Sequence, residues 1–145
     1  MSSAGQLLIA GRIPGERIQT TVITADSATF TTTEIVVATG TAAPLVAGRI
    51  YMVVFDAGFQ TTVDGILRVM IREDNLAGTS IQIRDFFIDN TGTASAARVE
   101  VEFEAQATGN KVFVATGDML SGGGTANLNA SGTLPSYLYV DYVRG

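Results

Sequence analysis

Hydrophobic and polar residues alternate with period two along most of the chain, and no segment shows the spacing of an amphipathic helix. In ILRVMIRE, residues 66–73, the apolar Leu67, Val69 and Ile71 alternate with two arginines and a methionine. RVEVEFEA, residues 98–105, alternates in the same way between apolar and charged residues. This pattern is typical of antiparallel strands that bury one face.

Seven other segments alternate less cleanly, and clusters of Gly, Asn, Asp and Pro separate them as turns do. They are RIQTTVIT (17–24), TTTEIVVATG (31–40), RIYMVVFDAGF (49–59), TSIQIRDFFID (79–89), NKVFVATGDM (110–119), TANLNASG (125–132) and SYLYVDYVRG (136–145). We therefore expect an all-β protein of about eight to ten strands, folded as an antiparallel two-sheet jelly-roll sandwich. A lipocalin-like barrel is the alternative, although no helix is predicted to close its end.

The first sixteen residues differ from the rest of the chain. AGQLLIAGRIPGE, residues 4–16, combines three glycines and a proline with the short apolar run Leu7–Ile9. This composition predicts an extended N-terminal arm over residues 1–16, followed by one β-sandwich domain over residues 17–145. We expect the arm to dock onto a neighbouring subunit, and the alternative is a strand at the edge of its own sheet.

The last predicted strand has no polar row. One row contains Tyr137, Tyr139, Asp141 and Val143, and the other contains Leu138, Val140 and Tyr142. Because a solvated face needs polar side chains, one row is expected to face the core and the other to face a partner. The alternative is that the two layers of one chain cover both rows.

Composition excludes several classes of chemistry. The chain of 145 residues has no Cys, His or Trp, which removes thiol nucleophiles, disulfides, imidazole bases and the usual zinc, copper and haem ligands. We expect no cofactor. The hydrophobic content of 46% with only 16% charged residues is apolar for one small domain, as in chains that bury surface in an assembly.

Charge and hydropathy also limit the partners. The net charge of -5 and the single lysine, Lys111, argue against nucleic acid, which requires clustered basic residues. No apolar stretch approaches the ~20 residues that span a bilayer, and the N-terminal segment lacks the basic region of an ordinary secretion signal. We expect no membrane and no small-molecule substrate.

A few residues are weak candidates for a catalytic site or a metal site. Glu100, Glu102 and Glu104 share one strand face, and two acids at a fixed separation suffice for a glycosidase, but a row of acids beside Arg98 is typical of a solvated face. A two-acid cell-wall hydrolase is therefore a third-ranked hypothesis, and we expect a non-enzyme.

The turns REDNLAG and FIDNTG offer oxygen ligands for a structural cation, but both sequences are also typical of ordinary turns.

Six segments together resemble a known family. They are IPGERI (13–18), TADSATFTTTE (24–34), VAGRIYMVVF (46–55), LRVMIRED (67–74), ATGNKVFVAT (107–116) and PSYLYVDYVRG (135–145). In order and spacing they resemble small virion proteins encoded among the structural genes of tailed phages of actinobacteria, usually described as minor tail or hypothetical proteins. The likeness covers nearly the whole chain, whereas many relatives carry the domain at the end of a longer, fibre-like chain.

The resemblance implies a jelly roll like those of tumour necrosis factor and C1q heads, which assemble as trimers around their last strand. It implies a homotrimer whose subunit interface contains Tyr137, Leu138, Tyr139, Val140 and Tyr142. The residues Leu7, Leu8, Ile9 and Ile13 are then expected to attach the arm to the major capsid protein or another virion protein.

The expected function is therefore that of a phage capsid decoration protein, located in the virion and assembled in the host cytoplasm. The alternative is a minor tail or fibre protein that binds the host surface. The apolar outer row requires only that some partner covers it, so a homodimer is an alternative to the homotrimer.

Overall fold

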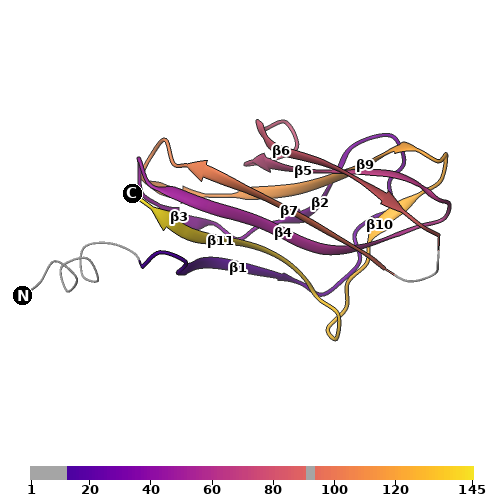
Figure 1. The fold of residues 1–145 in the computed structure, drawn as a ribbon, viewed down its shortest axis with the longest axis horizontal. Coiled ribbons are helices and arrows are strands. Elements are labelled where there is room, and N and C mark those ends of the chain that lie inside the picture. The colour runs from indigo at the N-terminus through magenta and orange to yellow at the C-terminus, as the bar shows by residue number, and fades with distance from the viewer. Residues whose placement is uncertain (1–12, 91–93) are drawn as a thin grey trace, which may run out of the picture.

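The computed structural model describes residues 13–90 and 94–145, and these form eleven strands (Figure 1). The strands are β1 (Arg17–Ile23), β2 (Ile35–Thr39), β3 (Ala43–Leu45), β4 (Ile50–Thr61), β5 (Gly65–Glu73), β6 (Ser80–Ile88), β7 (Ser95–Glu104), β8 (Gly109–Lys111), β9 (Phe113–Ser121), β10 (Ala126–Leu128) and β11 (Ser136–Arg144). Among the described residues there is no helix, as the alternating pattern predicted.

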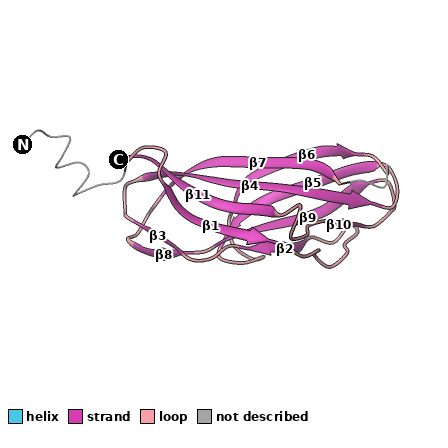
Figure 2. Cartoon of the chain, turned by 90° about the horizontal axis from the view of Figure 1, so that it is seen from below, coloured by secondary structure: helices cyan, strands magenta, loops and turns pink. Residues whose placement is uncertain are grey.

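Two antiparallel sheets form the layers of a sandwich (Figure 2). In the first sheet β11 lies between β1 and β4, β7 pairs with the other edge of β4, and the short β10 continues the line of β11 along β4. The second sheet has the order β2-β9-β5-β6. The three-residue β3 and β8 pair separately with each other.

This strand order is that of a jelly roll. When the eight longer strands are numbered along the chain, the first sheet has the order 1-8-3-6 and the second has the order 2-7-4-5, which is the double Greek key of that fold. The predicted fold class is confirmed, and each of the nine predicted segments contains a strand. Three of the eleven strands are only three residues long, and alternation over so few residues gives little signal.

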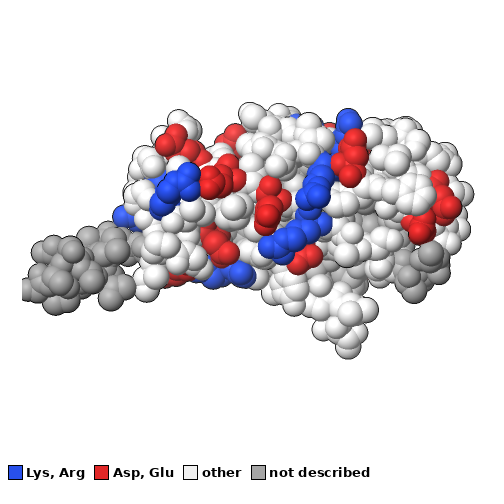
Figure 3. Space-filling view, viewed as in Figure 1, with Lys and Arg blue, Asp and Glu red and all other residues white. Residues whose placement is uncertain are grey.

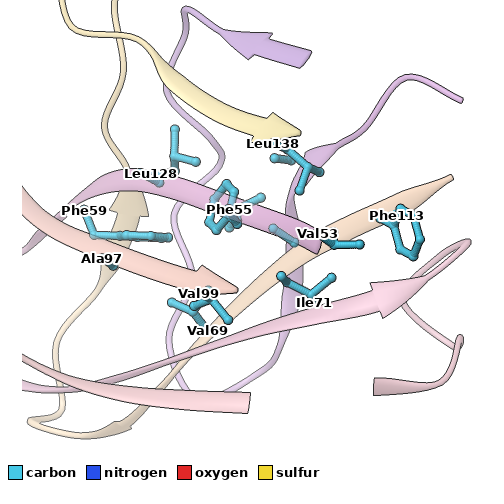
Figure 4. Close-up of a cluster of buried hydrophobic side chains, with 14 of the residues drawn as sticks. Val53, Phe55, Phe59, Val69, Ile71, Ala97, Val99, Phe113, Leu128 and Leu138 are labelled. Carbon is cyan, nitrogen blue, oxygen red and sulfur yellow. The ribbon is translucent and has the colours of Figure 1, made fainter. Parts of the chain in front are cut away.

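The core lies between the sheets and is built by the alternating apolar rows (Figure 4). Val69 and Ile71 of β5 and Val53 and Phe55 of β4 are each fully buried. One glycine is required by this packing: a Cβ on Gly117 would lie 2.9 Å from the ring of Phe30. The bare backbone of β9 thus makes room for the Phe30 ring.

Both ends of the described chain meet at one end of the sandwich (Figure 1). The amide of Gly15 donates a hydrogen bond of 2.7 Å to the carbonyl of Tyr142, and the amide of Tyr142 donates one of 2.8 Å to the carbonyl of Glu16. The pairing of β1 with β11 therefore continues as far back as Gly15. A loop between β10 and β11 projects from the body farther along the molecule.

Candidate binding surfaces

The two rows of β11 have different surroundings. Leu138, Val140 and Tyr142 point into the core and are only 3%, 4% and 4% exposed. These side chains already fill the interior of one chain, so a second subunit could not contact them without opening the sandwich. These three side chains are therefore removed from the predicted subunit interface, whose other two residues, Tyr137 and Tyr139, lie on the outer surface.

The contacts of Tyr142 explain why the sequence pattern did not identify it as a core residue. Its ring packs edge-on against that of Tyr51, with the centroids 5.9 Å apart, and its hydroxyl donates a 2.6 Å hydrogen bond to the carbonyl of Gly145. A tyrosine can be buried when its hydroxyl finds such a partner. The polar end that made Tyr142 look like an interface residue is satisfied within the chain.

The outward side chains of β1, β11, β4 and β7 form a surface that we call the front face. Tyr139 lies near its middle: the guanidinium carbon of Arg17 is 3.7 Å from the centroid of the Tyr139 ring, and Arg98 donates a 3.1 Å hydrogen bond to the Tyr139 hydroxyl. That hydrogen bond is the main cause of a raised pKa for Arg98. The ring is thus held between a cation–π contact and a hydrogen bond.

The charged side chains of the front face form ion pairs within the chain, and Figure 3 shows acidic and basic groups side by side on it. Arg17 pairs with Asp141. Arg98 pairs with Asp56 at 3.2 Å and with Glu100 at 3.4 Å. Arg144 forms a two-pronged pair with Glu102, with contacts of 2.9 and 3.1 Å. A partner could therefore cover this face without leaving these charges unpaired.

The glutamate row considered for catalysis lies on this face. The hydrogen bond from Arg144 lowers the pKa of Glu102, whereas a general acid requires a carboxyl whose pKa is raised. Lys111, the single lysine of the chain, forms ion pairs with Glu73 at 2.8 Å and with Asp74 at 3.1 Å. Burial lowers its pKa, but these two carboxylates outweigh that effect and raise it, which is opposite to the need of a lysine base.

The turns considered for a cation serve the fold. The Asn75 side chain accepts a 2.9 Å hydrogen bond from the amide of Ala77, and the Asn90 side chain donates one of 2.7 Å to the carbonyl of Thr62. Within residues 13–90 and 94–145, no group of three or more acidic side chains is placed to hold a metal ion. The same residues contain no helix long and apolar enough to cross a membrane.

A hollow of about 340 Å³ opens at the edge of the front face. It lies where the loop between β10 and β11 leaves the sheet, beside Gly58 of β4 and Ala96 of β7. Tyr137, Leu134 and Asp56 are among the larger side chains that line it. Leu134, at the projecting loop, is 74% exposed, so this region combines an uncovered apolar surface with polar groups.

The outward side of the β2-β9-β5-β6 sheet, which we call the back face, has an unusual carboxylate that the sequence did not indicate. Asp118 is 9% exposed and its Oδ1 atom has no hydrogen-bond partner. Burial is the main reason that its pKa is raised, and the attraction of Arg68 only partly opposes this effect. The one sequence signal is that Asp118 is the single charged residue of strand β9.

Next to Asp118, Glu34 has the opposite environment. It receives hydrogen bonds from Arg72, at 2.7 and 2.9 Å, and from Thr116. Burial alone would raise the pKa of Glu34, but these bonds outweigh it and lower the pKa. Glu34 is thus held by hydrogen bonds, whereas the Oδ1 atom of Asp118 has no hydrogen-bond partner.

The residues predicted for arm attachment lie mostly outside the described residues, including Leu7, Leu8 and Ile9. Ile13 is described, and its side chain is exposed. It begins a tight turn in which the amide of Glu16 donates a 2.8 Å hydrogen bond to the Ile13 carbonyl. Apolar surface is therefore uncovered where the arm joins the sandwich.

No protein-family model matches the chain, and no curated protein matches it. Solved structures with a similar fold include a carbohydrate-binding module of lichenase 5A from Cellvibrio mixtus in complex with cellotriose, with a TM-score of 0.46, 13% identity and coverage of 88% of this chain and 90% of that one. The xylan-binding domain of Xyn10C from Paenibacillus barcinonensis has a TM-score of 0.44 and 6% identity, with 93% and 99% coverage.

A third similar structure is the VP2 subviral particle of infectious bursal disease virus, with a TM-score of 0.44, 18% identity and coverage of 86% of this chain and 36% of that one. At these identities the likeness concerns the sandwich fold and says nothing of what this chain binds.

Proposed function

We propose that this chain is a non-catalytic structural protein of a phage virion, which decorates the capsid as a homotrimer. The observation that supports the proposal most is the arrangement around Tyr139 on the front face. Tyrosine and arginine are enriched at protein interfaces, and here Arg17 and Arg98 hold the ring in place before any partner arrives. A surface that is already ordered loses less entropy when it is covered.

The internal ion pairs of the front face support the same proposal. Burying a charge without a partner costs several kcal/mol, but Arg17, Arg98 and Arg144 each bring an acidic partner from the same chain. Three copies packed by this face would bury the Tyr139 rings together with charges that are already neutralised. The arm would then leave each subunit at Ile13, beside the C-terminus, and reach the capsid surface.

The proposed mechanism is adhesion to the capsid surface and involves no chemical reaction. Buried apolar surface contributes ~25 cal/mol per Å², and many weak contacts repeated over a shell act together through multivalency. A decoration protein of this kind reinforces the junctions between capsid subunits against internal pressure.

The second candidate function is a minor tail or fibre protein that contacts the host surface. The hollow beside Tyr137 favours it, because that hollow lies away from the end where the arm begins. Quantitative mass spectrometry of the purified virion separates the two functions. Decoration requires a copy number that scales with the number of capsid subunits, and a tail component requires a few copies per particle. Absence of the chain from the virion contradicts both.

A further inference from the structure

The aromatic side of the hollow is Tyr137, which is 37% exposed, whereas Tyr51 and Tyr142 are buried. Among the residues that the structure describes, its hydroxyl has no hydrogen-bond partner and its ring has no aromatic or cationic neighbour. A phenol ring joins a flat apolar face to a polar rim. Such a side chain suits a ligand that has both an apolar face and hydroxyl groups.

The polar side of the hollow consists of acceptors that are fixed in position. One oxygen of Asp56, Oδ2, accepts from Arg98 at 3.2 Å, and a carboxylate can accept several bonds, so Oδ1 has capacity left. The Asn129 amide donates a 3.1 Å hydrogen bond to Gln60, which leaves its own oxygen as an acceptor. Asp56 lies in β4 and Asn129 directly follows β10, so two adjacent segments supply the hollow with a small set of acceptors for hydroxyl donors.

The floor of the hollow is kept open by small residues. Gly58 pairs with Ala96 across β4 and β7, and a Cβ on Gly58 would lie 3.0 Å from the Ala94 side chain. The wall is the projecting loop, which is closed by a hydrogen bond of 3.1 Å from the amide of Ser131 to the carbonyl of Leu134. The cavity thus exists in the folded chain and requires no rearrangement to open.

We propose that this hollow is a binding site for a sugar ring of a neutral glycan. The sugar's C–H face packs on Tyr137, and its hydroxyls donate to Asp56 and Asn129. The volume of about 340 Å³ is near the lower end of the ~300–1,000 Å³ typical of ligand pockets, which fits a short stretch of glycan. A neutral sugar is favoured over an acidic one, because the lining contains no lysine or arginine and Asp56 is its one charged side chain.

The site goes beyond capsid decoration, because it gives a virion protein a contact with surface polysaccharide. It also assigns Tyr137 a role that competes with the predicted subunit interface. The two roles are separable: a glycan residue changes ligand affinity when it is mutated, and an interface residue changes the mass of the assembly.

Isothermal titration calorimetry of the full chain against neutral oligosaccharides of glucose, xylose, galactose and mannose tests the site, with trigalacturonic acid as the acidic control. We expect binding to at least one neutral sugar and none to the acid. Tyr137→Ala should lower the affinity by about tenfold or more, while Tyr137→Phe, which keeps the ring, should stay within about threefold. Ala96→Leu, which fills the hollow from β7, should also abolish binding.

Sedimentation of the same variants completes the test. The proposal requires that Tyr137→Ala and Ala96→Leu keep the wild-type mass and melting temperature, so that lost binding reflects the hollow itself. Failure of the wild type to bind any of the neutral sugars at up to about 10 mM overturns the proposal. A Tyr137→Ala variant that binds sugar normally but changes the oligomeric mass also overturns it, and would leave the proposed virion function intact.

Discussion

The guanidinium group of Arg17, in the first strand, lies over the ring of Tyr139, in the last strand, with its carbon 3.7 Å from the ring centroid. The contact joins the two ends of the domain on the front face, and Arg98 of β7 holds the Tyr139 hydroxyl from the other side at 3.1 Å. Side chains from three strands therefore order one half-buried tyrosine. This is the side chain that we expect at the centre of the assembly.

Replacement of Tyr139 tests that role. Tyr139→Ala removes the ring that the subunits would share, and truncation of a central interface residue costs about 2 kcal/mol or more. Tyr139→Phe keeps the ring and its contact with Arg17, so it should assemble as the wild type does. Sedimentation over a range of concentrations should show that the alanine variant dissociates first. Identical dissociation of the two variants would contradict the interface.

Gly117 and Phe30 provide a test of the core. A methyl group on Gly117 would meet the Phe30 ring at 2.9 Å, and overpacking of this kind typically costs about 1–3 kcal/mol. We expect Gly117→Ala to lower the free energy of unfolding by that amount in urea denaturation. Gly132→Ala is the matched control, because a Cβ there meets nothing within 4 Å. Equal stability of the two variants would show that the sandwich is packed differently.

Asp118 predicts a pH-dependent stability. Burial raises its pKa in the folded chain, so the folded state binds more protons than the unfolded state between the unfolded and folded pKa values. Its contribution is most favourable in acid and is lost as the pH rises through the folded pKa. At neutral pH, Asp118→Asn should therefore stabilise the protein, because it removes a buried charge that has no hydrogen-bond partner on one oxygen.

The difference between variant and wild type is the quantity to measure, because Glu34 acts in the opposite direction. The pKa of Glu34 is lowered, so its stabilising effect is lost as the pH falls through that folded pKa. Melting temperatures of Asp118→Asn and wild type should differ most near neutral pH and converge in acid. Asp89→Asn, the same substitution at an exposed position, is the matched control. A constant difference at every pH would refute this account of Asp118.

Deletion of residues 1–13 tests the arm. The hydrogen bonds that join the start of the sandwich to β11 begin at Gly15, so the shortened chain should fold and keep the wild-type melting temperature. It should also keep its oligomeric mass but no longer cosediment with capsids. Normal cosedimentation would show that attachment lies elsewhere, and unfolding would show that the segment belongs to the core.

The strands could be predicted because each long one buries a single face. Val99 and Arg98 in β7, for example, alternate in the sequence because one points into the core and the other out to the front face. The same rule failed for β11, where both rows are largely apolar. Which row enters the core depends on the pairing of Tyr142 with Tyr51, and a single strand does not contain that information.

The binding surfaces were less predictable than the strands. The hollow forms because β10 and β11 follow one another along the same edge of β4 with a loop between them, and only Gly58 and the turn residues before Ser136 hint at it. Asp118 lies opposite Arg68, but Arg68 donates its hydrogen bond to Asp85 at 3.0 Å, and Arg72 pairs with Glu34, so neither arginine is bound to Asp118. These relations join segments that are distant in the sequence.

The most direct test of the central claim is the mass of the purified chain in solution, measured by light scattering at several concentrations. Assembly through the front face predicts three times the chain mass of 15.2 kDa. A particle of one chain mass at every concentration would contradict the homotrimer and the role proposed for Tyr139.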